Sequence, residues 1–370
     1  MVDTVNFFEI LVKNNLDFFT GVPDSLLKEF CLCIKEKTDK KHNIIAANEG
    51  NAIALAAGYY LSTGKLGVVY MQNSGEGNAV NPLMSLTDPK VYSIPMLLII
   101  GWRGEPGVHD EPQHIKQGEV TLKLLETMGI EYCVLSDNYE EDINRMLLVA
   151  KKASKPTALV IRKGMFSKYI PISNEKEFMG DMLREEALEV ILDNIGEDPL
   201  VSTTGKESRE IFEIREKRNE GHGHDFLTVG SMGHTSSIAL GVSLGTNKNI
   251  WCLDGDGSFI MHMGSLAVAG QHSGDNFKYI INNNAAHESV GGQPTVGNKI
   301  DIKSILVACG FTHTYEARTK DEIANAIKKM KENGKSALVL YTKQGSRENL
   351  GRPTTTPIQN KEKYMEQFKK

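Results

Sequence analysis

Acidic, amide and glycine residues follow two apolar segments in the second half of the chain. The run Ile250-Trp251-Cys252-Leu253 leads into Asp254-Gly255-Asp256-Gly257-Ser258, and the next apolar run ends in Asn282-Asn283-Asn284. Glycines let a backbone approach an anion closely, and backbone amides with a serine hydroxyl can hold a phosphate. Because Mg²⁺ prefers oxygen ligands and substrate phosphates, it can join the carboxylate to such an anion. We therefore predict a magnesium and diphosphate site.

The interval between Asp256 and Asn283 fits a strand end, a crossover helix and the next parallel strand. Both side chains would then lie at the carboxyl edge of one sheet, where α/β proteins bind their ligands. A simple surface turn is the ordinary alternative for the two aspartates and glycines alone. The asparagines at the next strand end make that alternative much weaker.

Apolar runs of strand length, separated by amphipathic or alanine-rich helical segments, recur along both halves of the chain. The continuous runs are typical of parallel strands that are buried on both faces; they cover 67–71, 96–100, 158–161, 200–203, 250–253, 279–281 and 337–341. The pattern predicts an α/β protein with two doubly wound parallel-sheet domains. We expect these domains at 1–170 and 182–345, a linker at 171–181, and an extended polar tail at 346–370.

The overall composition narrows the class of protein. The chain has 370 residues and a formal net charge of −5, so it carries no basic footprint for nucleic acid. Its five cysteines form no CxxC pair, which is typical of reduced thiols. No apolar run approaches the ~18 residues of a membrane span, so we expect a cytoplasmic protein without membrane contact.

The Gly255-Asp256-Gly257-Ser258 motif followed by Asn283 resembles the diphosphate signature of thiamine-diphosphate enzymes. The resemblance implies that both domains have the thiamine-diphosphate-binding fold. It also implies thiamine diphosphate and Mg²⁺ as cofactors, with the metal held by the side chains of Asp256 and Asn283 and by the backbone carbonyl of Ala285. Gly255, Gly257 and Ser258 would then bind the cofactor.

Other segments match further parts of this family's pattern. Glu49 lies between a strand end and an alanine-rich helix, as does the family's glutamate opposite the aminopyrimidine ring; a carboxylic acid in an apolar pocket can share a proton with that ring. In Gly230-Ser231-Met232-Gly233, Met232 stands where the family places an apolar wedge between the cofactor rings, and the Gly230 carbonyl would accept from the 4′-amino group. Thr204-Gly205 resembles another cofactor-contacting turn.

The chain has room for the pyrimidine-binding and diphosphate-binding domains only, and in this it resembles the phosphonopyruvate and sulfopyruvate decarboxylases. The matching segments are 20–28, 70–78, 101–107, 288–295, 345–347 and 350–353. The resemblance implies non-oxidative decarboxylation, through the ylide of the cofactor, of 3-phosphonopyruvate to phosphonoacetaldehyde and CO₂. The partner would be a small 2-oxo acid with a phosphonate group.

Candidates for proton transfer follow from this implied reaction. Asp24 matches the acid that related decarboxylases place after the N-terminal turn and is the first candidate; His109, His114 and His287 are alternatives. The planar guanidinium of an arginine can donate two parallel N–H bonds to two oxygens of a phosphonate. We therefore expect substrate contacts from Arg103, at a strand end, with Ser25, and from Arg347 and Arg352, in a tail that could close over the site as a lid.

The resemblance also implies a homodimer or higher homo-oligomer with active sites at the subunit interface, because Glu49 would face cofactor held by a neighbour's Asp256. A sulfopyruvate or other 2-oxo acid decarboxylase remains open, since a sulfonate presents similar oxygens. A non-catalytic thiamine-diphosphate-binding subunit is a different possibility, which has no need of Glu49. A nicotinamide-dependent enzyme would require an early GxGxxG motif, and the sequence has none.

Overall fold

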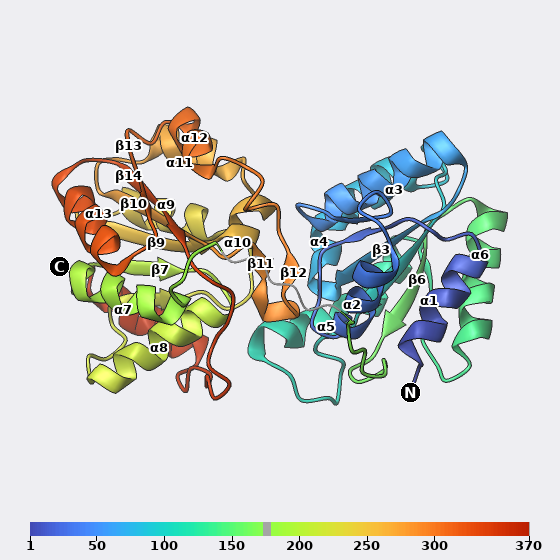
Figure 1. Ribbon diagram of the computed structural model, residues 1–370. Helices are drawn as coiled ribbons and strands as arrows, with labels where there is room; N and C mark the ends of the chain where they lie inside the picture. The colour runs from blue at the N-terminus through green and yellow to red at the C-terminus, as the bar shows by residue number, and fades with distance from the viewer. Residues whose placement is uncertain (173–178, 370) are drawn as a thin grey trace. The chain divides into compact units, whose positions relative to one another are not determined.

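A computed structural model describes residues 1–172 and 179–369, and the chain divides into two compact units, residues 1–174 and 175–370. Each unit is a parallel six-stranded sheet covered by helices on both faces (Figure 1). The predicted fold class, with two parallel-sheet units of α/β type, is confirmed. Within the described residues, no helix has the length and apolar character needed to span a membrane.

The first unit alternates short strands with helices. Its strands are β1 (Phe19–Gly21), β2 (Asn43–Ile45), β3 (Gly67–Gln72), β4 (Met96–Gly101), β5 (Glu131–Val134) and β6 (Thr157–Ile161). Its helices are α1 (Thr4–Lys13), α2 (Lys28–Lys37), α3 (Glu49–Thr63), α4 (Glu76–Pro82), α5 (Pro112–Thr127) and α6 (Tyr139–Ala153), with the short turns η1 (Asn73–Gly75) and η2 (Leu83–Thr87).

Alternate residues of the central strands face two separate cores in this unit. Val68 and Leu97 pack with helices α1, α2 and α6, whereas Val69 and Leu98 pack with α3, α4 and α5. This alternation explains why the strands are apolar without interruption, because each face of the sheet is covered. The strand order is β2-β1-β3-β4-β6-β5. The chain therefore adds β2 on one side of β1 and the later strands on the other, which places the switch point of the sheet between β1 and β3.

The second unit repeats the same plan. Its sheet strands are β7 (Leu200–Ser202), β8 (Asp225–Leu227), β9 (Ile250–Gly255), β10 (Phe277–Asn283), β13 (His313–Ala317) and β14 (Ser336–Tyr341), and β11 (Ala286–His287) with β12 (Gln293–Pro294) forms a small hairpin around η3 (Glu288–Val290). Its helices are α7 (Arg184–Ile195), α8 (Lys206–Arg218), α9 (Thr235–Leu244), α10 (Asp256–Met261), α11 (Ser265–His272), α12 (Ile302–Cys309), α13 (Lys320–Glu332) and α14 (Pro357–Glu366).

Both sheets have one topology. The order β8-β7-β9-β10-β14-β13 in the second unit corresponds, strand for strand along the chain, to the order in the first. The switch point therefore lies between β7 and β9, and the carboxyl ends of β7, β9 and β10 meet at one edge. Helices α7, α8 and α13 cover one face, and α9, α11 and α12 cover the other.

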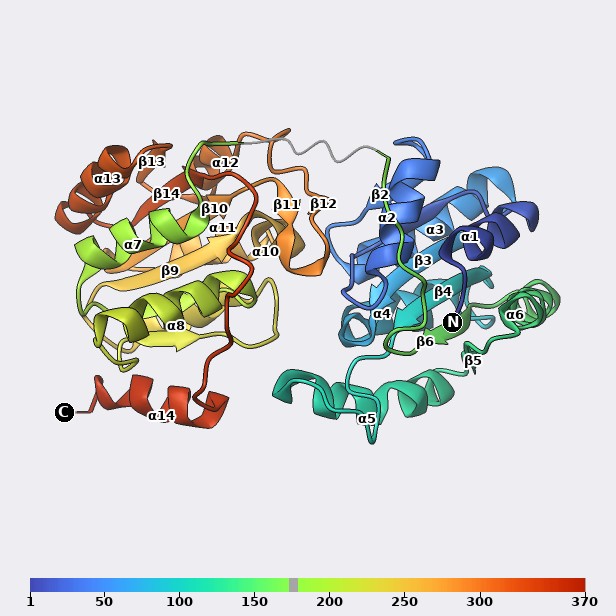
Figure 2. The ribbon, with the colours of Figure 1, turned by 60° about the horizontal axis from the view of Figure 1, so that its bottom comes forward.

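The tail differs from the extended segment that we predicted, because residues 357–366 form helix α14. Thr356 and Gln359 make a capping box, and Pro357 occupies the first helical turn, which together favour a helix start. The helix lies beside β8 at the edge of the second sheet (Figure 2). Buried Tyr364 anchors it there, so this part of the tail belongs to the second unit.

Candidate active site

The two strand ends that carry the predicted metal ligands are neighbours in the second sheet. β9 and β10 pair in parallel, with Gly255 opposite Asn282. Asp256, directly after β9, and Asn283, the last residue of β10, therefore lie side by side at the carboxyl edge, as predicted. Both are buried, with 2% and 0% of their surface exposed. Ala285 adopts a left-handed conformation with φ 55°, which lets the chain turn sharply after Asn283.

Oxygen atoms converge on Gly297 in this region. A Cβ built on Gly297 would lie 2.6 Å from Asn283 Oδ1, 3.0 Å from Asp256 Oδ2 and 3.1 Å from Thr295 Oγ1. A set of three oxygen ligands of this kind fits Mg²⁺. Only glycine at position 297 leaves these oxygens uncovered, because any other residue would place its Cβ against them. Burial raises the pKa of Asp256 to about 7; a divalent cation would favour the carboxylate form. Thr295, whose hydroxyl donates to Asp256 Oδ2, was not predicted from the sequence.

The turn around Met232 is tied to both neighbouring strand ends. The backbone N–H of Gly230 donates to Thr204 Oγ1 at 3.0 Å, and that of Gly233 donates to Ser258 Oγ at 3.0 Å. Gly230 and Ser231 have φ values of 72° and 47°, so the turn is left-handed. The structure thus brings together the turn, Thr204 and Ser258, all of which the sequence suggested as cofactor contacts.

Met232 and His287 meet over Gly257. A Cβ on Gly257 would lie 2.7 Å from His287 Nδ1 and 3.3 Å from the terminal methyl of Met232. Gly257 therefore lets the backbone at the start of α10 approach these side chains closely, a requirement that no other residue meets. Burial lowers the pKa of His287 to about 4, so its imidazole is neutral at physiological pH.

A buried ion-pair network fixes the hairpin that carries His287. Arg184 donates to both carboxylate oxygens of Glu210 at 2.6 and 2.8 Å and, through Nη1, to Glu288 at 2.7 Å. Glu288 also accepts from Asn284 at 2.9 Å and from Lys206 Nζ at 3.3 Å. The Ser289 hydroxyl lies where a Cβ on Gly205 would project, so the hairpin also contacts the Thr204-Gly205 turn.

In the first unit, Glu49 begins helix α3, as the sequence indicated. Its side chain is 5% exposed and accepts a hydrogen bond at 2.7 Å from Asn78 in α4. A Cβ on Gly75 would lie 2.5 Å from Glu49 Oε1, so this glycine gives the carboxyl group its space. Asn78 was not singled out from the sequence, although it lies in a segment that carried the resemblance.

Asp24, Ser25 and Arg103 come together at the carboxyl ends of β1 and β4. Arg103 Nη1 donates to Ser25 Oγ at 2.8 Å, and Arg103 Nε donates to Asp110 Oδ2 at 2.7 Å. Asp24 is fully buried, and burial raises its pKa to about 6. The positive charge of Arg103 lowers this pKa but does not cancel the effect of burial. Asp110 was missed, because its pairing depends on how the loop between β4 and α5 folds back.

The structure separates the candidate histidines His109 and His114 by environment. His114, in the first turn of α5, is 8% exposed, and burial with the nearby Arg103 charge lowers its pKa to about 4. His109 is exposed. In the second unit His222 is buried and stacks on Phe212 with ring centroids 4.0 Å apart.

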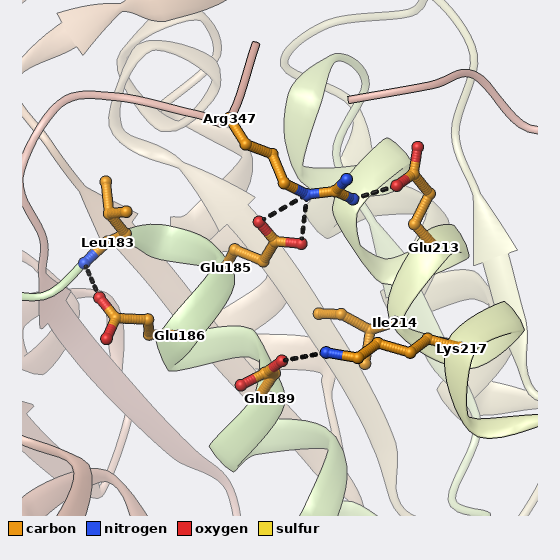
Figure 3. A pocket seen from close by; sticks show the side chains of 8 residues that line it. All are labelled: Leu183, Glu185, Glu186, Glu189, Glu213, Ile214, Lys217 and Arg347. Atoms are coloured by element: carbon orange, nitrogen blue, oxygen red, sulfur yellow. Dashed lines mark hydrogen bonds and ion pairs between the residues drawn. The ribbon is translucent and has the colours of Figure 1, made fainter. Parts of the chain in front are cut away.

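Arg347 lies in an acidic cleft of about 450 Å³ on the second unit. Its guanidinium pairs with Glu185 of α7 and Glu213 of α8 (Figure 3). Four of the lining residues are glutamates, in the set Leu183, Glu185, Glu186, Glu189, Glu213, Ile214, Lys217 and Arg347. Here Arg347 ties the tail to α7 and α8, and substrate contacts by Arg347 and Arg352 stay predictions.

Two protein-family descriptions match the chain, one in each unit. Residues 5–134 match the thiamine pyrophosphate enzyme N-terminal TPP binding domain, and residues 204–340 match the C-terminal TPP binding domain. Thiamine pyrophosphate is another name for thiamine diphosphate. The second match includes Asp256, Asn283 and Met232, and the first includes Glu49.

Curated relatives align with most of the chain. Phosphonopyruvate decarboxylase from Streptomyces viridochromogenes is 32% identical over 335 residues, covering 85% of this chain and 82% of the relative. The phosphonopyruvate decarboxylase of Streptomyces hygroscopicus is 32% identical and covers 87% and 83%. The sulfopyruvate decarboxylase of Methanosarcina acetivorans is 26% identical, with 87% and 86% covered.

Proposed function

Since the chain belongs to the thiamine pyrophosphate enzymes, in the group of the phosphonopyruvate decarboxylases, we propose that it converts 3-phosphonopyruvate to phosphonoacetaldehyde and CO₂. The convergence of Asp256, Asn283 and Thr295 oxygens around Gly297 is the observation that carries the cofactor assignment, because it suits Mg²⁺ bound to a diphosphate. The two relatives with 32% identity support the substrate.

The residues of the second unit would hold the cofactor. Asp256, Asn283 and the Ala285 carbonyl would bind Mg²⁺, while the N–H groups at the start of α10 and the Thr204-Gly205 turn would face the diphosphate. Met232 would wedge between the cofactor rings. When bound, thiamine diphosphate supplies the electron sink that decarboxylation of a 2-oxo acid requires.

The residues of the first unit would act on the cofactor and the substrate. Glu49, held by Asn78, would share a proton with the aminopyrimidine ring. Asp24, with a pKa of about 6, would supply the proton that the product carbon needs once CO₂ has left. Arg103 would bind the phosphonate, since an arginine fork matches its oxygens. His109 and the neutral His114 and His287 are the alternative proton carriers.

We further propose a homo-oligomer in which Glu49 of one subunit serves the cofactor bound by its neighbour, and a cytoplasmic location. Arg347 and Arg352 would bind the substrate if the tail closed over the site as a lid. That movement would break the pairs of Arg347 with Glu185 and Glu213.

Sulfopyruvate is the second candidate substrate, because the sulfopyruvate decarboxylase relative aligns with 87% of the chain and a sulfonate offers similar oxygens to Arg103. Steady-state assays of CO₂ release with phosphonopyruvate, sulfopyruvate and pyruvate decide between them. We expect the largest kcat/KM for phosphonopyruvate. A larger kcat/KM for sulfopyruvate would mean that sulfopyruvate is the substrate. A larger kcat/KM for pyruvate would mean that the enzyme does not recognise an anionic group on the substrate side chain.

A further inference from the structure

The segment Thr295–Gly297, which follows the β11–β12 hairpin, is hydrogen-bonded to every group proposed to bind the metal. The Thr295 hydroxyl donates to Asp256 Oδ2. The Thr295 N–H donates to the Ala285 carbonyl at 3.0 Å, and Asn283 Nδ2 donates to the Gly297 carbonyl at 2.8 Å. Thr295 is 8% exposed, so its bonds to Asp256 and Ala285 are shielded from water.

These bonds determine which atoms face the metal position. A carboxamide can present either its oxygen or its nitrogen, and only the oxygen can bind a cation. Because Asn283 Nδ2 donates to Gly297 and Asn283 Oδ1 accepts from the Ala285 N–H at 3.1 Å, the amide is held in one orientation. Its oxygen is the atom that points toward Asp256, on the side where a Gly297 Cβ would lie.

The same bonds leave lone pairs for a cation. A carbonyl oxygen has two lone pairs, and Thr295 N–H uses one of those on Ala285. The Thr295 hydroxyl engages one carboxylate oxygen of Asp256, and the carboxylate has further acceptor sites. The segment therefore orients the three ligands and leaves them able to bind Mg²⁺.

A hydroxyl is needed at position 295 because it donates one hydrogen bond and accepts another. It donates its one proton to Asp256 and accepts from the Gly297 N–H at 3.1 Å. Serine can make both bonds, whereas valine has the shape of threonine and makes neither. Gly297 is equally constrained, since its Cβ would fall 2.6 Å from Asn283 Oδ1.

We propose that Thr295 is a positioning residue of the magnesium site and that the segment Thr295–Gly297 sets the affinity of this chain for Mg²⁺. This inference rests on the proposed function and deepens it. Groups that orient metal ligands from outside the coordination sphere typically contribute 10–100-fold in metal affinity. Arg184, Lys206 and Asn284 strengthen the arrangement, because their bonds to Glu288 hold the hairpin that leads into the segment.

The experiment is calorimetric titration of Mg²⁺ into the chain at a fixed concentration of thiamine diphosphate, with the heat of Mg²⁺ binding to free thiamine diphosphate measured separately and subtracted. Thr295→Val is expected to weaken Mg²⁺ binding by about 10–100-fold, and Thr295→Ser by less than about 3-fold. Thr157→Val, which removes a buried threonine bond to the Met146 carbonyl in the other unit, is the matched control and should bind Mg²⁺ as the wild type does. Gly297→Ala should weaken binding at least as much as Thr295→Val.

Wild-type affinity in Thr295→Val, or an equal loss in Thr295→Ser, would overturn the inference. If Thr295→Val does not fold, Thr295→Ala is titrated in its place under the same thresholds, with melting in metal-free buffer as the test of folding. Failure of the wild type itself to bind thiamine diphosphate with Mg²⁺ would instead contradict the proposed function, so the two failures are distinct.

Discussion

Arg103 and Asp110 form a two-point ion pair, in which Nε and Nη2 of the guanidinium face the two carboxylate oxygens of Asp110. Asp110 also accepts from the backbone N–H groups of Gly104 and Glu111 at 2.9 and 2.8 Å. The pair therefore fixes the loop between β4 and α5 and aims the arginine at the same time. A guanidinium has five N–H donors, so Arg103 can still donate to an anion while it holds Asp110 and Ser25.

Replacing Arg103 by lysine tests its proposed contact with the phosphonate. Lysine has a single charged nitrogen and cannot form the fork, so we expect KM for phosphonopyruvate to rise by about 10–100-fold. KM for pyruvate, which lacks the phosphonate, should change little. Arg145→Lys, at a half-exposed site in α6, is the control for steady-state kinetics. An equal rise in KM for both substrates would mean that Arg103 only fixes the loop.

Asp24 gives a prediction about the pH dependence of turnover. If the protonated carboxyl group donates to the product carbon, turnover needs the acid form, which is present below a pKa of about 6 and is lost as the pH rises through it. We expect kcat to fall above that pH in the wild type. Asp24→Asn should lower kcat by about 10²–10⁴-fold. A pH profile of the variant that keeps the same descending limb would assign the titration to another group.

Mixing two inactive variants tests whether subunits share active sites. Glu49→Gln should abolish turnover while thiamine diphosphate still binds, and Asp256→Asn should lose metal and cofactor binding. In a shared-site dimer, each hybrid contains one site with both native residues, so statistical remixing should restore about a quarter of the activity. Turnover is measured after subunit exchange has been verified by mass spectrometry. Complete exchange without recovery would place Glu49 and Asp256 in the site of a single chain.

Strand ends and the residues directly after them could be predicted from the sequence. Asp256, Asn283, Thr204 and Arg103 all follow apolar runs, and parallel pairing brings such positions to one edge of a sheet. The position of Glu49 could be predicted equally well, because Asn48 caps the helix that starts at this glutamate. These strand ends could be predicted because each sheet has a hydrophobic core on both faces. Its central strands are therefore apolar throughout, and the point where the apolar run stops marks the strand end.

Residues whose position depends on a loop could not be predicted. Thr295 reaches Asp256 only because the β11–β12 hairpin folds back, and Asp110 reaches Arg103 through an irregular turn. Neither contact leaves a periodic signal. Three strands at sheet edges, β5, β8 and β13, were missed because they mix polar with apolar residues and so lack continuous apolar runs.

Asn360 of α14 supports the edge of the second sheet, and its removal should be costly. Its Nδ2 donates to the Asp225 carbonyl at 2.8 Å, and its Oδ1 accepts from the Leu227 N–H at 3.0 Å. Asn360→Ala would leave both backbone groups buried without these partners, so we expect the free energy of unfolding to fall by about 2–4 kcal/mol. Urea denaturation measures it, with Asn247→Ala at an exposed position as control. A loss equal to that of the control would mean that water replaces the asparagine.

Glu76, the first residue of α4, should make the first unit less stable as the pH rises. Its side chain is 2% exposed, and burial raises its pKa from 4.5 to about 8. The hydroxyl of its neighbour Thr121 already donates to the Gln117 carbonyl at 2.7 Å and accepts from Asn73 at 2.9 Å. Since Thr121 has one proton, the neutral acid is the form of Glu76 that fits beside it.

Between pH 4.5 and about 8 the folded chain therefore keeps a proton on Glu76 that the unfolded chain has lost. Stability then decreases with pH across this window, because the folded state binds more protons. Glu76→Gln keeps the shape and cannot ionise, so the variant should lose this part of the pH dependence and gain about 1–3 kcal/mol relative to wild type at pH 8. Thermal unfolding from pH 5 to pH 8 measures the difference, with Glu140→Gln in α6 as control. A constant difference between variant and wild type across this range would show that Glu76 is ionised in the folded chain.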